Sequence, residues 1–429
     1  MTKVARSRKI TKKSITAIAS IIILVLPTAT LMIPQLSFIP PSPLDAEKHV
    51  LAFYYDWYGN NSALSYTNYS NSMIGVTDIS GPYGTSIWGN STPINWTYIQ
   101  QFSLPRNESE VISNNFTMNK TWMDTAHFPE WGPYHSADPA KMKKDLVNAA
   151  YCGVDTFIMT WWGRNNYIDQ NFENFLNYAY YLEVNESIQN IPNFTMYFEH
   201  AQDWPEEYGP HEEEIVNEIV YFINRYGNHP KFFKVNNIPV IFIWATTARG
   251  TTLDRWVHIK NKVEMEVGKL YWHAMGGYGR SEKGLDTLSN PLFSSIFDGF
   301  HVYMTSSLLH NVGDEEEAAP HTIRQLYQHC VDSARKKGIN FAPGILPGYD
   351  DTNIPDREGS ILNRRGTIEY GNKWTYAGMW EDAIAVGVKW VCIVTWNEWW
   401  EGTEIDTSYE YGELFLNMTK TYSTIFKSS

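Results

Sequence analysis

Cysteine is scarce in this 429-residue chain, and Cys152, Cys330 and Cys392 show no C-x-x-C spacing. A disulfide framework and a cysteine-ligated zinc site are therefore excluded. Cys152 and Cys392 lie among apolar residues and are predicted to be small core residues, although a single disulfide between an undetermined pair stays open. The chain also lacks H-E-x-x-H, glycine-rich phosphate-loop and G-x-S-x-G motifs, which argues against metalloproteases, nucleotide-binding enzymes and serine esterases.

Basic residues are few outside the N-terminus. Six of the 34 Lys and Arg lie within residues 1–13, so the remainder carries 28 against 47 Asp and Glu, a net charge of −19. Such a domain repels phosphate backbones, which argues against nucleic-acid binding. It also disfavours a strongly anionic polysaccharide, whereas a neutral glycan fits. The aromatic fraction of 15% favours flat rings for sugar faces, with a large aromatic core as the alternative.

The N-terminus predicts export. Residues 1–13 form a basic tail without acidic residues, and the 20 residues from Ser14 to Ile33 carry no charge. That length crosses a bilayer core of ~30 Å as a helix, and flanking basic residues stay in the cytoplasm. We therefore predict a basic cytoplasmic tail (1–13), a transmembrane anchor or signal segment (14–34), a proline-rich linker (35–47) and an extracytoplasmic globular domain (48–429). A cleaved signal peptide, giving a secreted protein, is the alternative.

Glycosylation signals agree with export. Ten N-x-S/T sequons occur, and seven of them lie between Asn60 and Asn119 in a polar stretch with little periodicity. The clustering indicates either a glycosylated surface insertion or an Asn/Ser/Thr-rich loop that produces sequons by chance.

Beyond the linker, short apolar runs alternate with amphipathic stretches. Eight runs are predicted strands: His49–Tyr55, Val154–Thr160, Phe194–His200, Pro239–Trp244, Leu270–Ala274, Ile296–Val302, Asn340–Ile345 and Val388–Thr395. Helices are predicted near 138–151, 168–183, 211–226, 251–267, 320–337, 373–386 and 411–426. This alternation predicts a single (β/α)8 (TIM) barrel with long βα loops, preceded by the N-terminal transmembrane helix. The first connection, 56–137, carries a large insertion, and an open doubly wound sheet is the alternative.

Catalytic groups of such barrels lie on the loops that follow the carboxyl ends of the strands. The last predicted strand runs into T-W-N-E-W-W-E-G-T-E-I-D (395–406), which places Glu398 and Glu401 among tryptophans. Glycoside hydrolysis commonly needs two carboxylates, and apolar surroundings raise a carboxyl pKa as a general acid requires. The two side chains come together if the chain makes a helical turn after Thr395. A pair of solvated loop glutamates or a structural ion pair is the alternative.

The 395–406 segment resembles the W-N-E-W-x-E-G-T signature of glycoside hydrolase family 99, the endo-α-1,2-mannosidase and mannanase family. F-Y-Y-D-W-Y (53–58), V-D-T-F-I-M-T-W-W (154–162), F-D-G-F-H-V-Y (297–303) and P-G-Y-D-D-T (347–352) are similar to its other blocks, in the same order. The resemblance covers nearly all of residues 50–410. The glutamate block is specific, whereas each of the others is weak alone.

The resemblance implies retaining hydrolysis within an α-mannoside chain, without a metal or a cofactor. Glu398 would be the base on the 2-hydroxyl of the reacting mannose, which closes a 1,2-anhydro ring, and Glu401 would be the general acid and then the base. Both roles need carboxylates in opposed protonation states. Substrate-binding residues would be Tyr55, Trp162, Glu199, Tyr303, Tyr349, Asp350, Asp351, Trp396 and Asn397. Glu199 is as readily a support for a tyrosine, and Asp350 and Asp351 are as readily turn residues after Gly348.

The sequence departs from the family pattern at three places. The family's H-I-E-P is Y-F-E-H here, which puts Tyr197 where a ligand-contacting histidine is usual. His301 stands where tyrosine is usual, and I-P-D-R-E (354–358) replaces I-R-P-W-N. These changes bear on subsite specificity more than on the reaction. A surface glycan-binding protein on an inactive barrel and an enzyme of surface polysaccharide remodelling are the rival functions, and fold resemblance alone does not assign the glycan.

Overall fold

The computed structural model describes residues 47–58, 108–109, 125–132, 134–165, 167–199, 212–244, 246, 252–276, 290–303, 322–354, 359–367 and 369–429. The predicted anchor, the linker up to residue 46 and most of the first connection lie outside these ranges, as does the departing segment 355–358. None of the helices within the ranges is both long and apolar enough to cross a membrane. Residues Ser42–Ser429 group into one compact unit.

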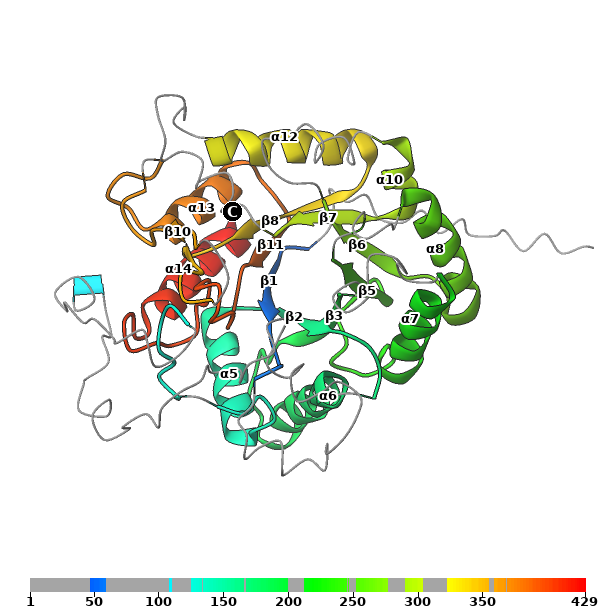
Figure 1. Cartoon of the computed structure of the whole chain (residues 1–429), viewed down its shortest axis with the longest axis horizontal. Coiled ribbons are helices and arrows are strands. Elements are labelled where there is room, and N and C mark those ends of the chain that lie inside the picture. Colours follow the sequence, from blue (N-terminus) through cyan, green and yellow to red (C-terminus); the bar gives the residue numbers. More distant parts are fainter. Residues whose placement is uncertain are drawn as a thin grey trace, which may run out of the picture. The chain divides into compact units, whose positions relative to one another are not determined.

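Eight parallel strands form a closed barrel (Figure 1). They follow one another around the barrel in chain order, and the pairing of β1 with β11 joins the first strand to the last. β3 pairs directly with β5, while the short β4 (Lys234–Val235), which lies between them in the sequence, pairs antiparallel with β5. This closure confirms the predicted barrel and excludes the open doubly wound sheet. The barrel strands are β1 (His49–Tyr54), β2 (Thr156–Trp161), β3 (Asn193–Phe198), β5 (Ile238–Ile243), β6 (Tyr271–Met275), β7 (Gly299–Val302), β8 (Asn340–Ile345) and β11 (Trp390–Ile393).

A helix follows each barrel strand, and the helices surround the barrel in Figure 1. Local sequence sets their ends: Asp138 caps α5 through the Ala140 N–H, Pro139 occupies the first turn, and Gly153 ends the helix at φ +79°. The helices are α5 (Pro139–Cys152), α6 (Tyr167–Asn185), α7 (Glu212–Tyr226), α8 (Leu253–Val267), α10 (Pro291–Ile296), α12 (Thr322–Lys337), α13 (Thr375–Ala385) and α14 (Leu414–Ser428).

Most predicted strand bounds differ from the observed ones by one or two residues, and the largest error lies at the sixth strand. The run Ile296–Val302 was expected to be wholly extended, but Ile296 ends helix α10 and strand β7 begins at Gly299. The Asn290 side chain accepts a hydrogen bond from the Leu292 N–H, and Pro291 fits the first helical turn. This capping pair starts a six-residue helix, which is too short to leave an amphipathic pattern in the sequence.

The barrel interior is packed with aromatic rings and contains two buried histidines. His273 of β6 and His301 of β7 place their Nδ1 atoms 3.2 Å apart, and Trp390 stacks on His273 with ring centroids 5.4 Å apart. Burial lowers the pKa of His301 to about 3 and that of His273 well below its ordinary value. Both rings are therefore neutral at physiological pH and serve as polar members of the core.

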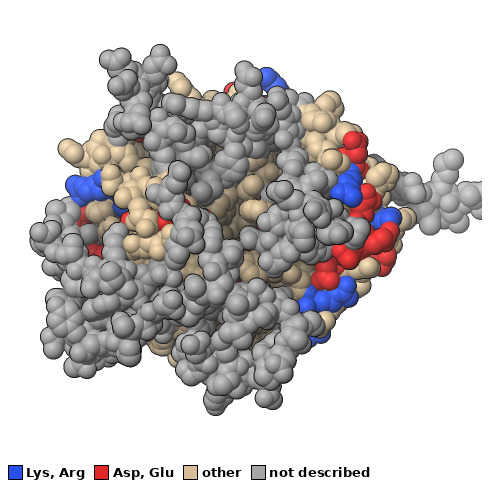
Figure 2. All heavy atoms as spheres, in the orientation of Figure 1, with Lys and Arg blue, Asp and Glu red and all other residues tan. Residues whose placement is uncertain are grey.

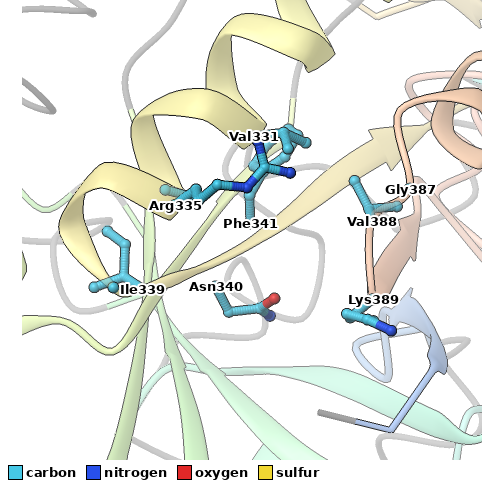
Figure 3. Close-up of a pocket in the computed structure, with 10 residues that line it drawn as sticks. Val331, Arg335, Ile339, Asn340, Phe341, Gly387, Val388 and Lys389 are labelled. Atoms are coloured by element: carbon cyan, nitrogen blue, oxygen red, sulfur yellow. The ribbon is translucent and has the colours of Figure 1, made fainter. Parts of the chain in front are cut away.

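Charged side chains lie on the outer helices. Lys262 of α8 pairs with Glu213 of α7, and Arg255 pairs with Glu212, so acidic and basic groups alternate along this edge of the molecule (Figure 2). A cavity of about 120 Å³ opens at the amino ends of β8 and β11, beside Asn340 and Lys389 (Figure 3). Because all barrel strands are parallel, this cavity lies at the opposite end of the barrel from the predicted catalytic glutamates.

Candidate active site

Residues that follow different barrel strands meet at one mouth. The hydroxyl oxygens of Tyr55, after β1, and Tyr303, after β7, are 2.6 Å apart. The Trp57 ring lies 5.2 Å from that of Trp162, after β2, and 5.8 Å from that of Trp400, after β11. The polar and aromatic ends of several strands therefore converge, through contacts between residues as distant as 57 and 400.

The two ends of the loop after β11 lie side by side. Its base is closed by hydrogen bonds from Thr395 N–H to the Thr403 carbonyl, 2.8 Å, and from Ile405 N–H to the Thr395 carbonyl, 3.0 Å. Within it, the Glu398 N–H donates to Thr395 Oγ1 over 2.8 Å, and Gly402 turns the chain at φ +58°. Turns and bends, and not the expected helical turn, therefore present Glu398 and Glu401 from one short loop.

Glu398 and Glu401 face the tyrosine pair. Glu398 is buried, whereas Glu401 is partly exposed. Burial is the first cause that raises the pKa of the Tyr55 phenol well above its ordinary value, and the charges of Glu199, Glu398 and Glu401 raise it further. Burial, the neighbouring Tyr55 and both loop glutamates act on the pKa of Tyr303 in the same direction. Both phenols therefore stay protonated and can donate hydrogen bonds beside a group of carboxylates.

Asn397 and Trp396 are framework residues in this structure. Asn397 Oδ1 accepts from the Tyr55 N–H and its Nδ2 donates to the Tyr55 carbonyl, each over 2.8 Å. Trp396 has no exposed surface and packs edge-on against Phe157, 5.1 Å between centroids. Both residues are buried and fix the loop that carries the glutamates, and their contact with substrate stays a prediction.

Glu199 is held by the end of the neighbouring strand. Its Oε1 accepts from Thr160 Oγ1 over 2.6 Å, and its Oε2 accepts from Trp162 Nε1 over 3.3 Å. The carboxylate is almost wholly buried, 4% exposed. These contacts orient Trp162, which is partly exposed, and keep a negative charge near Tyr55. The geometry thus favours the supporting role that the sequence left open for Glu199.

The segment that follows β8 forms a hairpin of β9 (Tyr349–Asp350) and β10 (Ile361–Leu362). The Asp351 carboxylate accepts from the Tyr349 hydroxyl, 2.9 Å, and from the Ser360 N–H, 2.6 Å. Asp350 Oδ1 accepts from the Thr352 N–H over 3.1 Å, and the Asp350 N–H donates to the Glu401 carbonyl over 2.8 Å. The hairpin therefore contacts the loop that carries the two glutamates directly, and its aspartates stabilise the turn.

Two of the departures from the family pattern meet in the barrel. The Tyr197 hydroxyl lies 3.2 Å from His301 Nε2 and donates to Met275 Sδ over 3.6 Å. The Tyr197 ring also stacks beside that of Tyr303, with centroids 6.2 Å apart. The two residues that depart from the family pattern, Tyr197 and His301, therefore lie next to each other and beside the Tyr55–Tyr303 pair.

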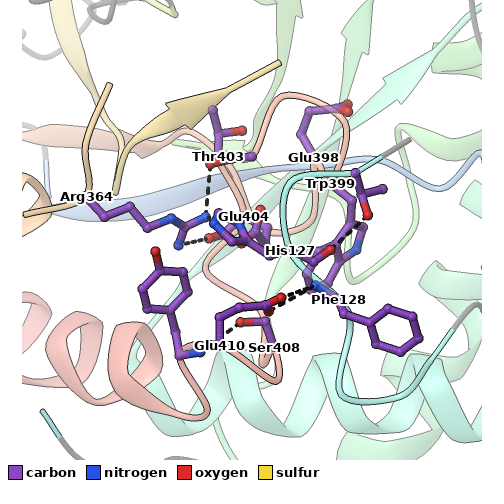
Figure 4. A network of polar contacts seen from close by, with 12 residues as sticks. His127, Phe128, Arg364, Glu398, Trp399, Thr403, Glu404, Ser408 and Glu410 are labelled. Atoms are coloured by element: carbon purple, nitrogen blue, oxygen red, sulfur yellow. Dashed lines mark hydrogen bonds and ion pairs between the residues drawn. The ribbon is translucent and has the colours of Figure 1, made fainter. Parts of the chain in front are cut away.

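A buried ionic cluster beside the loop was missed from the sequence. Arg364 forms an ion pair with Glu404, and His127 Nδ1 lies 2.8 Å from the same carboxylate (Figure 4). Glu404 is 1% exposed. The only signal was the position of Glu404 inside the 395–406 segment. In the sequence, Arg364 resembles a solvated residue of a charged loop because Arg365 stands beside it, and His127 resembles an isolated loop histidine.

A (β/α)8 barrel with paired glutamates on the loop after its last strand, neighboured by tyrosines and tryptophans, is the arrangement of a sugar-cleaving enzyme. Residues 44–411 match the family described as Glycosyl hydrolase family 99, and the chain belongs to that family. It is therefore a glycoside hydrolase. The expectation drawn from its sequence motifs is confirmed.

Known relatives agree with this membership. The chain is 22% identical over 383 residues to the glycoprotein endo-alpha-1,2-mannosidase of Xenopus laevis, covering 85% of this chain and 71% of the relative. It is also 22% identical over 369 residues to the Mus musculus protein of the same name, covering 83% and 67%. A solved GH99 endo-alpha-mannosidase from Bacteroides thetaiotaomicron has the same fold, with a TM-score of 0.59, 18% identity, and coverage of 89% of this chain and 98% of that one.

Proposed function

We propose that this glycoside hydrolase cuts within mannose-containing glycans at α-mannosidic, most directly α-1,2, linkages. The observation that carries the proposal is the meeting of Glu398, Glu401, Tyr55 and Tyr303 at one mouth in a chain of family 99. The printed names of the relatives supply the linkage. The acidic charge of the domain agrees with a neutral glycan.

The first half of the proposed reaction forms a strained sugar. The Glu398 carboxylate takes the proton of the 2-hydroxyl on the reacting mannose, and the 2-oxygen attacks the anomeric carbon. At the same time the protonated Glu401 gives its proton to the leaving glycosidic oxygen. The bond to that oxygen breaks, and a 1,2-anhydro sugar with inverted configuration remains.

The second half restores the configuration. Glu401, now a carboxylate, takes a proton from water, and the water oxygen attacks the anomeric carbon. The three-membered ring opens, and the 2-oxygen recovers its proton from Glu398. Two inversions give net retention, the leaving oxygen keeps the proton from Glu401, and the proton taken from water restores the acid form of Glu401. The neutral phenols of Tyr55 and Tyr303 donate hydrogen bonds near the reacting sugar.

Trp162, Tyr349, Asp350 and Asp351 remain proposed substrate contacts. Trp162 is a partly exposed ring at the mouth, and it offers an apolar face for a sugar ring. Asp350 is half-buried and lies on the hairpin next to Glu401, so one of its oxygens can serve a sugar hydroxyl while the other holds Thr352. Glu199 is proposed to act through Trp162 and Tyr55.

Cleavage of defined glycans tests the proposal. The full-length chain is incubated with α-mannan and with manno-oligosaccharides in which an internal mannose is α-1,2-linked to the next sugar and keeps its own 2-hydroxyl free, and products are sized for wild type, Glu398→Gln and Glu401→Gln. Internal products from wild type that fall by at least ~10³-fold in both variants support the reaction. Binding without cleavage by wild type favours the glycan-binding rival, and a requirement for an activated sugar donor favours the remodelling rival. Neither binding nor cleavage refutes the mannose assignment.

We also propose that the domain is tethered to the outer face of a membrane by residues 14–34, with the basic tail in the cytoplasm. The uncharged 20-residue run and the preceding basic residues support this topology. Alkaline carbonate extraction of producing cells provides the test. Recovery of the full-length chain in the membrane pellet agrees with the anchor, whereas a shortened chain in the medium shows the secreted alternative.

A further inference from the structure

Arg364 binds the C-terminal part of the loop that carries the two glutamates. Its Nη1 donates to the Glu404 carbonyl over 3.0 Å, and its Nη2 donates to the Gly402 carbonyl over 2.9 Å. The same guanidinium forms the ion pair with the Glu404 carboxylate (Figure 4). Only 5% of the arginine side chain is exposed. One buried cation thus fixes two backbone carbonyls and one carboxylate within three consecutive residues.

The surroundings hold the guanidinium in place. It lies 4.6 Å from the centre of the Tyr411 ring and 4.7 Å from that of Phe415. Gly348 makes room for the side chain, because a Cβ atom there would come within 2.6 Å of Arg364 Cγ. The Arg364 carbonyl also accepts from the Thr375 N–H over 2.8 Å, which ties the residue to the start of α13. The arginine is therefore presented rigidly and loses little freedom in binding the loop.

Two consecutive backbone attachments begin at Glu401. Its own carbonyl accepts from the Asp350 N–H of the β9–β10 hairpin, 2.8 Å, and the next carbonyl, that of Gly402, accepts from Arg364. A residue whose backbone is held at two consecutive carbonyls has few ways to shift its side chain. We propose that Arg364 is a positioning residue for Glu401 and sets the placement of its carboxyl beside the Tyr55–Tyr303 pair. This inference rests on the proposed role of Glu401 as general acid.

Lysine cannot replace this arginine. A guanidinium offers several donors in a planar fork, whereas an ammonium is a point charge that cannot reach both carbonyls and the carboxylate in the same geometry. Loss of the cation altogether leaves the Glu404 carboxylate buried with His127 as its remaining ionic partner among the described residues. Lysine at position 364 keeps the positive charge but loses the planar set of donors, so this substitution separates the positioning role of Arg364 from its charge.

Leaving-group chemistry distinguishes positioning of the acid from general support of the fold. An oligosaccharide leaving group needs protonation by the acid, whereas fluoride leaves with little help. A misplaced Glu401 therefore slows cleavage of an α-mannobiosyl oligosaccharide far more than cleavage of α-mannobiosyl fluoride. General loosening of the site slows both equally.

The experiment compares kcat/KM on both substrates for wild type, Glu401→Gln, Arg364→Lys and the charge-balanced double variant Arg364→Met/Glu404→Gln. The double variant removes both buried charges together, so that folding is preserved and is checked by thermal unfolding. Arg365→Met is the matched control, because Arg365 is adjacent, exposed and paired only with Glu108 among the described residues. Both Arg364 variants should lose about 100-fold on the oligosaccharide and less than about 10-fold on the fluoride, in the pattern of Glu401→Gln.

Equal losses on the two substrates, or no loss in folded variants, overturn the positioning role while leaving the proposed reaction intact. A wild type that cleaves neither substrate refutes the proposed function instead. In that event crystal structures of wild type and Arg364→Lys decide the inference. Displacement of the 398–404 loop supports it, and an unchanged loop overturns it.

Discussion

The side-chain amide of Asn397 makes two hydrogen bonds to the backbone of Tyr55, accepting from its N–H and donating to its carbonyl, each over 2.8 Å. The pair continues the parallel ladder of β1 and β11 past its last paired residues, Ala52 and Ile393. It therefore holds the carboxyl end of the last barrel strand, β11, against that of the first, β1. These two hydrogen bonds therefore fix the position of the loop with the two glutamates relative to Tyr55.

Asn397→Ala should destabilise the fold and reduce turnover. The substitution leaves the N–H and the carbonyl of Tyr55 buried without these partners, which costs about 2–4 kcal/mol of unfolding free energy. Chemical denaturation measures the loss, and kcat should fall with it. Asn261→Ala is the control, because Asn261 is exposed on α8 and its truncation should change stability by less than about 0.5 kcal/mol. Equal effects of the two substitutions would show that the two hydrogen bonds of Asn397 are unimportant.

Gly402→Ala should be more harmful than a glycine substitution at the same backbone angle elsewhere. Gly402 has φ +58°, and an added Cβ would lie 3.0 Å from the Asp350 carbonyl oxygen and 3.1 Å from its nitrogen. Gly371 has φ +60° with no atom within 4 Å of the added Cβ. Gly371→Ala should therefore cost only the left-handed strain of about 1–2 kcal/mol. Gly402→Ala should cost more and also lower kcat, as thermal unfolding and steady-state kinetics will show.

Tyr55→Phe and Tyr303→Phe should each reduce kcat/KM by about 10- to 100-fold, which corresponds to about 1.4–2.7 kcal/mol. Burial keeps both phenols protonated, so each loses a hydrogen-bond donor beside the carboxylates. Because the two hydroxyls contact each other, the double variant should lose less than the product of the single losses. Tyr180→Phe, at an exposed position, is the control for activity. Strictly multiplicative losses contradict a shared role.

The buried histidines should make the fold sensitive to acid. The folded pKa of His301 is about 3, below the value near 6.5 of an unfolded histidine, so the unfolded chain binds the extra proton between these values. Stability is therefore fully present above about pH 6.5 and falls as the pH drops, by up to about 1.4 kcal/mol per pH unit for each such histidine. Denaturation of His301→Gln between pH 6.5 and 4 should show a shallower decline. The exposed His258→Gln should follow wild type.

The sequence predicted strands and helices well where burial produces a recognisable hydrophobic pattern. Strand β8 (Asn340–Ile345) is buried on both faces, and its bounds are the predicted ones. The β9–β10 hairpin was not predicted, because two-residue strands have no periodicity to detect. Helix α10 was missed for the same reason, since its six residues complete fewer than two turns.

The candidate site was predicted in part. The motif around Glu398 and Glu401 was visible in the sequence, but whether Trp396 and Asn397 face the mouth was not, because strand alternation ends where the loop turns. The contact of Arg364 with Glu404 joins residues 40 apart, and that of His127 with Glu404 joins residues 277 apart. Such pairs depend on the closed barrel and have no local signature.

The stereochemistry of the first product tests the central claim most directly. The full-length chain is mixed with a manno-oligosaccharide whose reacting mannose is α-1,2-linked to the next sugar and has a free 2-hydroxyl, and the anomeric proton NMR signals of the new reducing end are followed before mutarotation. Reaction through Glu398 and Glu401 with a 1,2-anhydro sugar predicts an α-configured product first, and no product when the reacting 2-hydroxyl is methylated. A β-configured first product, or unimpaired cleavage of the methylated substrate, contradicts the account.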